Sequence, residues 1–175
     1  MMRKMMLLAV MTLSGAPLQG SLAATPLGEI NIELYGNIVD FTCVAEGSDS
    51  NKSVTLGTWP TKQLSTMGSR TQAMPFTLKL TGCPPGAASI TFTGKVDARD
   101  PQLLALNDAS QASNVAVEIR DHDKTRLPLQ QASQEMVVDA QGNAVLAFYA
   151  NYIATANNPT PGRADADATF MINYY

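Results

Sequence analysis

The sequence predicts an all-β domain, and three observations carry that prediction. Apolar and polar residues alternate with a period of two in several short runs, whereas helical periodicity is scarce. Turn-forming residues separate the runs, as in Pro84-Pro85-Gly86 and Gln141-Gly142-Asn143. The chain has two cysteines, which allow one cross-link. Seven or eight short strands with a single bridge are typical of a β-sandwich of the immunoglobulin type.

The expected strands follow one another with only short interruptions. They are centred on residues 30–34, 54–56, 76–80, 90–92, 115–119, 145–149 and 170–174. One short helical piece is expected around Leu103 to Leu106, after Pro101. No linker, low-complexity segment or internal repeat interrupts this order, so the pattern indicates one domain.

Composition supports a single domain without catalytic chemistry. The chain has 175 residues, of which 45% are hydrophobic and 15% charged, so it can bury a core. Its net charge is −3 and it has no basic block, which disfavours nucleic acid and anionic membranes as partners. One histidine and two cysteines are too few for a His/Cys zinc site or for most catalytic triads. We therefore expect no metal, no cofactor and no enzymatic activity.

Residues 1–23 have the pattern of a secretory signal. Arg3 and Lys4 precede an apolar run from Met5 to Leu13, and small residues follow up to Ala23, where cleavage is expected. The apolar run is shorter than the roughly 20 residues that span a bilayer, so we expect no membrane insertion. Export makes a disulfide between the two cysteines possible. Closing the loop between the two cysteines contributes roughly 3–4 kcal/mol to stability in the chain-entropy model.

Segment 24–39 forms an N-terminal arm with an unusual need for a partner. Ile30, Ile32 and Leu34 alternate with polar residues, and burying each side chain would contribute roughly 1.5–3 kcal/mol. Gly36 then interrupts the pattern, which suggests close approach of another backbone. The arm is either the first strand of its own domain or a strand that pairs elsewhere.

The C-terminus is a two-faced strand that continues to the last residue. From Gly162 onward the even-numbered residues are small or apolar, and most odd-numbered residues are polar. Because chain ends usually fray, a terminal strand this regular needs a pairing partner.

These features together resemble a known family. They are an arm with the pattern Ile32-x-Leu34-x-Gly36-x-Ile38, the cysteines Cys43 and Cys83, a late strand from Val145 to Tyr152, and an ending from Gly162 to Tyr175. Gly162 is fourteenth from the end and Tyr174 second from the end, as in the C-terminal motif of the family. The chain thus resembles the pilus subunits of the chaperone–usher pathway, particularly those of type 1 fimbriae.

The resemblance implies an incomplete immunoglobulin-like sandwich that lacks its last strand. A periplasmic chaperone would fill the resulting groove first, and at the outer-membrane usher the arm of another pilin subunit would replace it. The donor residues would be Ile30, Ile32, Leu34, Gly36 and Ile38. The groove edge and chaperone contact would include Gly162, Phe170, Ile172, Tyr174 and Tyr175. The implied product is a surface fimbria that supports adhesion.

The implied organisation has a signal peptide at 1–23, a donor-strand arm at 24–39 and a pilin domain at 40–175. A tip adhesin is the nearest alternative, but the chain has no room for a receptor-binding domain before the pilin domain. A self-complete secreted immunoglobulin-like module that binds a ligand through its loops is the alternative of a different class. A secreted enzyme comes third, since His122 lies in an expected turn without a nucleophile nearby.

Overall fold

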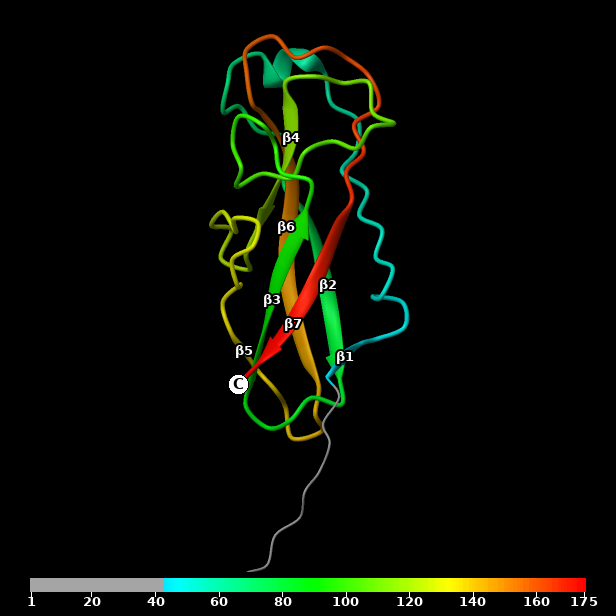
Figure 1. Cartoon of the computed structure of the whole chain (residues 1–175), viewed down its shortest axis with the longest axis vertical. Helices are drawn as coiled ribbons and strands as arrows, with labels where there is room; N and C mark the ends of the chain where they lie inside the picture. The colour runs from blue at the N-terminus through cyan, green and yellow to red at the C-terminus, as the bar shows by residue number, and fades with distance from the viewer. Residues whose placement is uncertain (1–42) are drawn as a thin grey trace, which may run out of the picture. The chain divides into compact units, whose positions relative to one another are not determined.

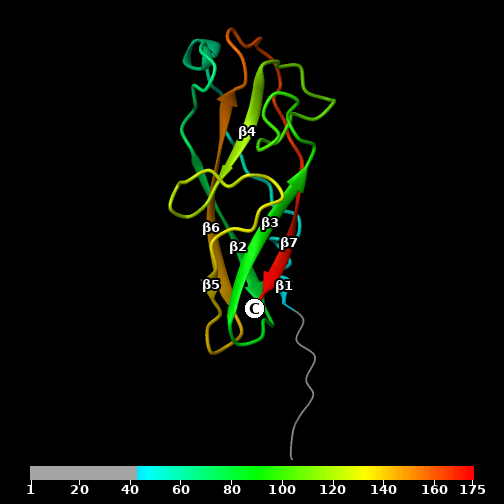
Figure 2. The same cartoon turned by 60° about the vertical axis from the view of Figure 1, so that its left-hand side comes forward.

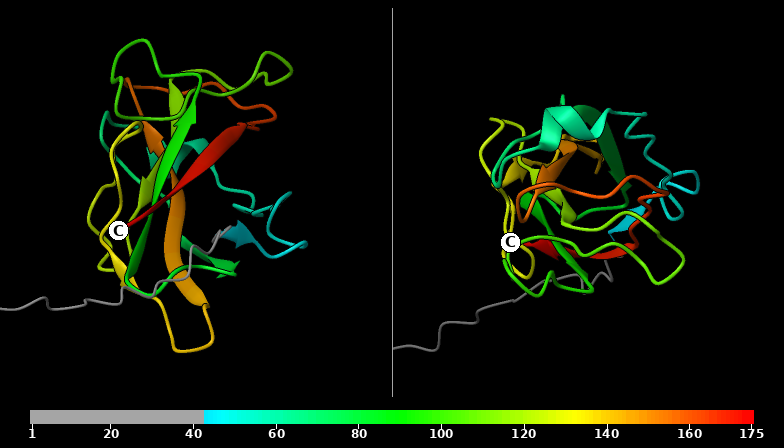
Figure 3. Two further views of the ribbon diagram at one scale, coloured as in Figure 1. Left: turned by 60° about the horizontal axis from the view of Figure 1, so that its bottom comes forward. Right: turned by 90° about the horizontal axis from the view of Figure 1, so that it is seen from above.

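The computed structural model describes residues 43–175, and this part of the chain is a sandwich of two antiparallel β-sheets (Figure 1). One sheet has the strand order β1-β2-β6-β4 and the other has the order β5-β3-β7. In Figure 3, strands β3 and β7 cross in front of β6, which shows the two layers. The expected signal at 1–23 and the expected arm at 24–39 lie outside the described residues.

The four-stranded sheet is built around its longest strand. Strand β6 (Ala144–Ala154) pairs with β2 (Met74–Thr81) on one side and with β4 (Val115–Arg120) on the other. Strand β1 (Val44–Ala45) adds a short edge beside β2. Because the register sets Phe76 opposite Phe148, side chains of the same alternation point to the same face.

The three-stranded sheet contains the C-terminus. Strand β3 (Ala87–Gly94) pairs with β5 (Met136–Val137) on one side and with β7 (Ala168–Tyr174) on the other. The register sets Ile90 opposite Ile172, so the even-numbered residues of both strands share one face. The alternation in the sequence assigned this face correctly.

Apolar residues of the two inner faces form the core. Phe148, Leu78, Leu80 and Ile90 are its largest fully buried apolar side chains. A Phe92–Phe148 pair joins the sheets, with ring centroids 5.0 Å apart in an edge-to-face arrangement. Burying each such side chain contributes roughly 1.5–3 kcal/mol, so this interior dominates the stability of the domain.

Two local expectations from the sequence are wrong. The expected strand over Val54 and Leu56 is not formed, although both residues turn inward and their neighbours are exposed. The expected helical piece at Leu103 to Leu106 is a turn followed by a bridge between Leu104 and Val117. A backbone pair with β4 satisfies Leu104 there and removes the reason for a helix. The short helix is instead the 3-10 turn at Thr61–Leu64, which buries Leu64.

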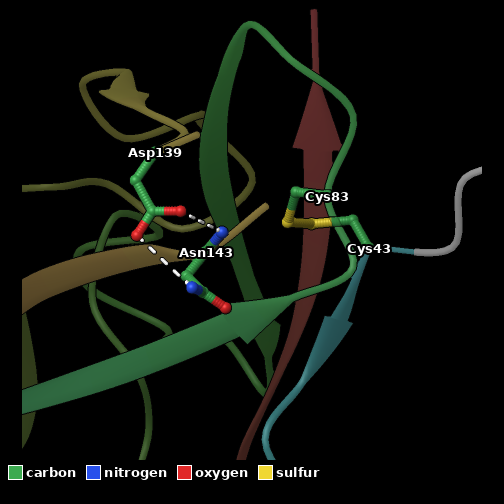
Figure 4. Close-up of a disulfide and its surroundings, with 4 residues drawn as sticks. All are labelled: Cys43, Cys83, Asp139 and Asn143. Atoms are coloured by element: carbon green, nitrogen blue, oxygen red, sulfur yellow. Dashed lines mark hydrogen bonds between the residues drawn. A yellow bond between two sulfur atoms is a disulfide. The ribbon is translucent and has the colours of Figure 1, made fainter. Parts of the chain in front are cut away.

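A disulfide fixes the base of the sandwich, as the sequence predicts. Cys43 precedes β1 and is bonded to Cys83, which follows β2 (Figure 4). The Cys83 backbone N–H donates to the Gly142 carbonyl oxygen at 3.0 Å, so the turn before β6 is joined to the same end. The Asp139 carboxylate shapes this turn by accepting from the backbone N–H groups of Gln141 and Asn143. The start of the described chain is thereby held against two strands.

The outer face of the four-stranded sheet carries a buried carboxylate. Glu118 on β4 is fully buried and accepts hydrogen bonds from three guanidinium groups. The distances are 2.9 Å from Arg70 Nε, 2.8 Å from Arg120 Nη2 and 2.8 Å from Arg126 Nε. Burial alone would raise the pKa of Glu118, but these hydrogen bonds lower it to about 2. The carboxylate therefore stays charged and ties the segment before β2, through Arg70, and the segment after β4, through Arg126, to the sheet.

Candidate functional site

Strand β7 has one edge without a partner strand among residues 43–175. It is the last strand in the order β5-β3-β7. Ala87 and Tyr175 bond to each other twice, since each backbone N–H donates to the other's carbonyl oxygen, at distances of 3.3 and 2.9 Å. In an antiparallel pair such residues alternate with residues whose backbone groups point the other way. The register therefore directs the N–H and C=O groups of Ala168, Phe170, Ile172 and Tyr174 toward the free edge.

A groove of about 1130 Å³ lies beside this edge. One wall is segment 164–170, which leads into β7, and the other is segment 50–58, drawn in cyan on the same side of the domain (Figures 1 and 2). Apolar side chains from both sheets line it. They are Phe76, Leu78, Phe92, Leu104, Val117, Ile119, Ala150 and Tyr152. The groove is thus a gap between the two sheets through which the core is reached.

Aromatic rings continue from the core into the groove. Phe92 contacts both Phe148, in the centre of the core, and Phe170 on β7, with centroids 6.4 Å apart in the second pair. Phe76 packs against Phe92 and Phe148 from β2. Because Phe170 is only half-buried, part of this cluster still presents apolar surface to the groove.

A tyrosine hydroxyl holds one wall in place. Tyr152 on β6 lines the groove, and its hydroxyl donates to the Ala164 carbonyl oxygen at 2.7 Å. Burial, together with the charge of Asp165, raises the pKa of Tyr152, so the hydroxyl stays protonated as a donor. The bond ties the approach to β7 across the groove to the opposite sheet.

Polar residues hold the same wall from outside. The backbone N–H of Asn107 donates to the Asp165 carbonyl oxygen at 2.8 Å, and its side-chain amide donates to Asp167 Oδ2 at 2.9 Å. Ser110 also donates to the Asp165 carbonyl oxygen, at 2.9 Å. Segment 163–167 therefore has its odd-numbered residues bonded to segment 107–111, while Ala166 packs against the core.

Of the predicted groove-edge residues, Phe170, Ile172 and Tyr174 lie on β7, Tyr175 follows it and Gly162 precedes it. Phe170 lines the groove and Ile172 packs against the core, while Tyr174 is 53% exposed. Tyr175 continues the pairing with β3 through its backbone. Gly162 lies before the groove wall with φ +155°, where an added Cβ would meet the Ala112 nitrogen at 2.7 Å, so its role is to allow close packing.

Several groove residues were not singled out from the sequence. Phe76 and Phe92 have the alternation of ordinary core residues, and nothing in the local sequence indicates that they line a groove. Segment 50–58 lines the groove without belonging to a strand. Tyr152 was expected at the end of the late strand, but the contact of its hydroxyl was not, because the partner is a backbone carbonyl. The predicted donor residues Ile30, Ile32, Leu34, Gly36 and Ile38 lie outside the described residues.

Neither a metal centre nor a membrane span emerges from residues 43–175. No group of three or more His, Cys, Asp or Glu side chains in this range could hold a metal ion. None of the helices in the same range is long and apolar enough to cross a membrane. His122 lies in a turn, with its Nδ1 3.1 Å from Asp121 Oδ1.

A disulfide-linked, immunoglobulin-like sandwich with a free strand edge beside an apolar groove defines a domain that can accept a β-strand. A family model described as fimbrial protein matches residues 32–175, so the chain belongs to the fimbrial protein family. It is 60% identical to the fimbrial-like protein FimF of Salmonella typhimurium, over 88% of this chain and 89% of that protein. It is 32% identical to the type-1 fimbrial protein, A chain, of Salmonella typhi, over 95% and 94% of the two chains.

Solved structures agree with this membership. A Burkholderia pseudomallei antigen and type I fimbria protein superposes with a TM-score of 0.60 at 29% identity, covering 78% of this chain and 91% of that one. The P pilus rod subunit PapA superposes with a TM-score of 0.63 at 17% identity, covering 76% and 99%. The second likeness concerns the fold alone.

Proposed function

We propose that this chain is a structural subunit of a bacterial surface fimbria and is joined to its neighbours by strand donation. The groove beside β7 accepts the N-terminal arm of another subunit, which completes the sandwich. Before assembly, a periplasmic chaperone occupies the groove and delivers the subunit to an outer-membrane usher. The assembled fimbria lies outside the cell and supports adhesion.

The observation that carries this proposal is the pairing of an apolar groove with a free strand edge in a member of the fimbrial family. Backbone groups on the free edge need partners, and the apolar side chains in the groove gain from burial. A strand with alternating aliphatic residues satisfies both needs at once. An edge left bare would instead promote aggregation, which gives the chaperone its role.

The arm at 24–39 supplies such a strand, with the signal at 1–23 removed on export and the pilin domain spanning 40–175. Its donor side chains are Ile30, Ile32, Leu34 and Ile38, and Gly36 allows close approach at one position. Because the arm of each subunit enters the groove of another, the contact is heterologous and does not close on itself. The product is a filament.

Residues at the end of β7 face the chaperone in this scheme. The contact includes Phe170, Ile172 and Tyr174, with Gly162 at the start of the motif. Backbone pairing with Ala87 holds Tyr175 in a defined position after β7. Basic chaperone side chains bind its carboxylate there. This role is mechanical and uses no catalytic residue.

A sandwich complete within its own chain would have a strand at the free edge of β7, and none of residues 43–175 lies there as a strand. Membership of the fimbrial protein family also favours a fimbrial subunit over a self-complete binding module. A tip adhesin is not favoured for a different reason, since the chain covers 89% of the fimbrial-like protein FimF and 94% of the type-1 fimbrial protein, A chain.

The test measures unfolding of a chain that begins at Val39, with and without peptides that copy Ala24 to Val39. At a peptide concentration about a hundredfold above Kd, the chain should gain about 2.7 kcal/mol of stability. A peptide with Ile32→Asp is the control and should give no gain, because a carboxylate cannot enter the apolar groove. A stable chain indifferent to every alternating strand peptide would contradict the proposal.

A further inference from the structure

The rim of the groove carries negatively charged side chains that have no role in the proposed function. Asp165 and Asp167 are exposed residues on the wall that leads into β7. They belong to the odd-numbered set, whose side chains point outward, while Ala166 and Phe170 pack inward. Any strand that pairs with this wall therefore lays its outward side chains on the same face as these carboxylates.

Basic residues near the rim only partly offset this charge. Arg163 Nε lies 3.0 Å from Asp165 Oδ2, with both side chains more than half exposed. Lys52 on the other wall pairs with Asp49, at 2.7 Å. Asn107 gives Asp167 a neutral hydrogen-bond donor. The outward face of this wall therefore keeps a negative charge.

The chain's own arm has the same sign. Segment 24–39 contains Glu29 and Glu33 and no basic residue. Both glutamates are odd-numbered, whereas Ile30, Ile32 and Leu34 are even-numbered. If the aliphatic side chains enter the groove, the period of two turns both glutamates outward, whichever direction the strand runs.

We propose that Asp165 and Asp167 act as a charge filter on the donor strand. They disfavour an arm with outward carboxylates, including the arm of a second copy of this chain. They favour an arm from a different subunit whose outward side chains are neutral or basic. This inference rests on the proposed function, because it concerns which strand enters the groove.

The size of the effect follows from exposed cross-strand charges. Like charges opposite each other in a sheet cost roughly 0.2–1 kcal/mol per pair, which is about 1.4- to 5-fold in affinity. Glu29 and Glu33 are four residues apart, whereas Asp165 and Asp167 are two apart, so at most one pair can lie directly opposite. The expected difference is therefore about 1.4- to 5-fold at low ionic strength. Salt screens exposed charges, so the difference should shrink toward one at about 0.5 M salt.

The experiment uses the full chain, exported with its own leader and isolated from the periplasm. It measures binding of two labelled peptides that copy residues 24–39, one with the natural sequence and one with Glu29→Gln and Glu33→Gln. Both are titrated against the natural chain and against a variant with Asp165→Asn and Asp167→Asn. A chain with Glu135→Gln is the control for overall charge, since Glu135 is exposed and is not among the groove-lining residues.

The glutamine peptide should bind the natural chain about 1.4- to 5-fold more tightly at about 0.02 M salt. The advantage should fall toward one with the asparagine variant and should persist with Glu135→Gln. Equal binding of both peptides at low salt would overturn the charge filter and leave strand donation standing. Binding of neither peptide, nor of an arm from another fimbrial chain, would contradict the proposed function itself. The peptide comparison with the natural chain remains decisive even if the asparagine variant does not fold.

Discussion

The two sheets of this domain end in edges that the chain treats in opposite ways. At the edge of β4, Val117 and Leu104 bond to each other through both backbone groups, at 2.9 and 3.0 Å, and Leu127 donates to the Ile119 carbonyl oxygen at 2.9 Å. At the edge of β7, the corresponding groups face a groove. On the proposed function, a loop that closed the second edge in the same way would block strand donation.

The side chains beside each edge follow the same division. Around β4, Glu118 has three arginine partners and the apolar residues are buried. Around β7, Phe170 is half-buried and Tyr174 is 53% exposed. On the proposed function, stability and binding are assigned to different edges of one fold, so substitutions should separate them.

The largest expected effect comes from the same substitution made in the core, at Phe148, and beside the groove, at Phe170. Phe148→Ala should cost about 3–5 kcal/mol of unfolding free energy, because Phe148 is 1% exposed at the centre of the core. Phe170→Ala should cost about 1 kcal/mol in the chain alone, since Phe170 is half-buried. Denaturant unfolding with the disulfide intact measures both.

The stabilisation gained from a bound strand peptide should depend more on Phe170 than on Phe148. Phe170→Ala should weaken the stabilisation by a strand peptide, because the ring presents apolar surface to the groove. If the two alanine variants lost equal stability without peptide, Phe170 would be part of the stabilising core and not of a binding surface.

Acid should weaken the β4 region. The pKa of Glu118 falls from 4.5 to about 2 on folding, so its ion pairs stabilise the chain fully above pH 4.5. As the pH falls through about 2, the carboxylate is protonated in the folded state as well, and about 3 kcal/mol of stability is lost. Acid titration of the unfolding free energy measures this loss.

Glu118→Gln is the matched variant for the acid experiment. It should be less stable at neutral pH by about 3–5 kcal/mol, because three arginines lose a buried partner. Its stability should then vary less between pH 5 and pH 2 than that of the natural chain. An equally steep loss in the variant would assign the acid sensitivity to other carboxylates.

Sequence reasoning found most of the fold because alternation records which face each residue occupies. Strands β2, β3, β4, β6 and β7 all lie where the period of two predicts them. The same rule failed at Val54 and Leu56, since alternation assigns faces but does not supply a neighbouring strand. Strand β1 and strand β5 have two residues each, too few for a period to appear.

The sequence predicted only part of the candidate site, for a related reason. The C-terminal motif pointed to Phe170 and Ile172, but a groove has two walls and a floor that come from distant parts of the chain. The contact of Tyr152 with Ala164 depends on how β6 passes the start of β7, which no local pattern contains. Glu118 likewise had the pattern of an ordinary outward strand residue, and its arginines come from three separate positions.

The smallest expected effect concerns the hydrogen bond that joins β6 to the wall of the groove. Tyr152→Phe keeps the ring in the groove and removes the bond to the Ala164 carbonyl oxygen. The loss should be about 0.5–1.5 kcal/mol of unfolding free energy, the usual net contribution of one such bond. Tyr149→Phe is the matched control, because it removes a hydroxyl from the other face of the same strand.

Hydrogen exchange should show where the effect of Tyr152→Phe is felt. The Asn107 amide, which donates to Asp165, should exchange faster, because the wall it holds has lost its anchor on the opposite sheet. Amides of β4 should be unchanged, since that edge is closed by its own bonds. Faster exchange in β4 as well would mean that the two edges are coupled, and the groove wall would then be part of the stabilising core.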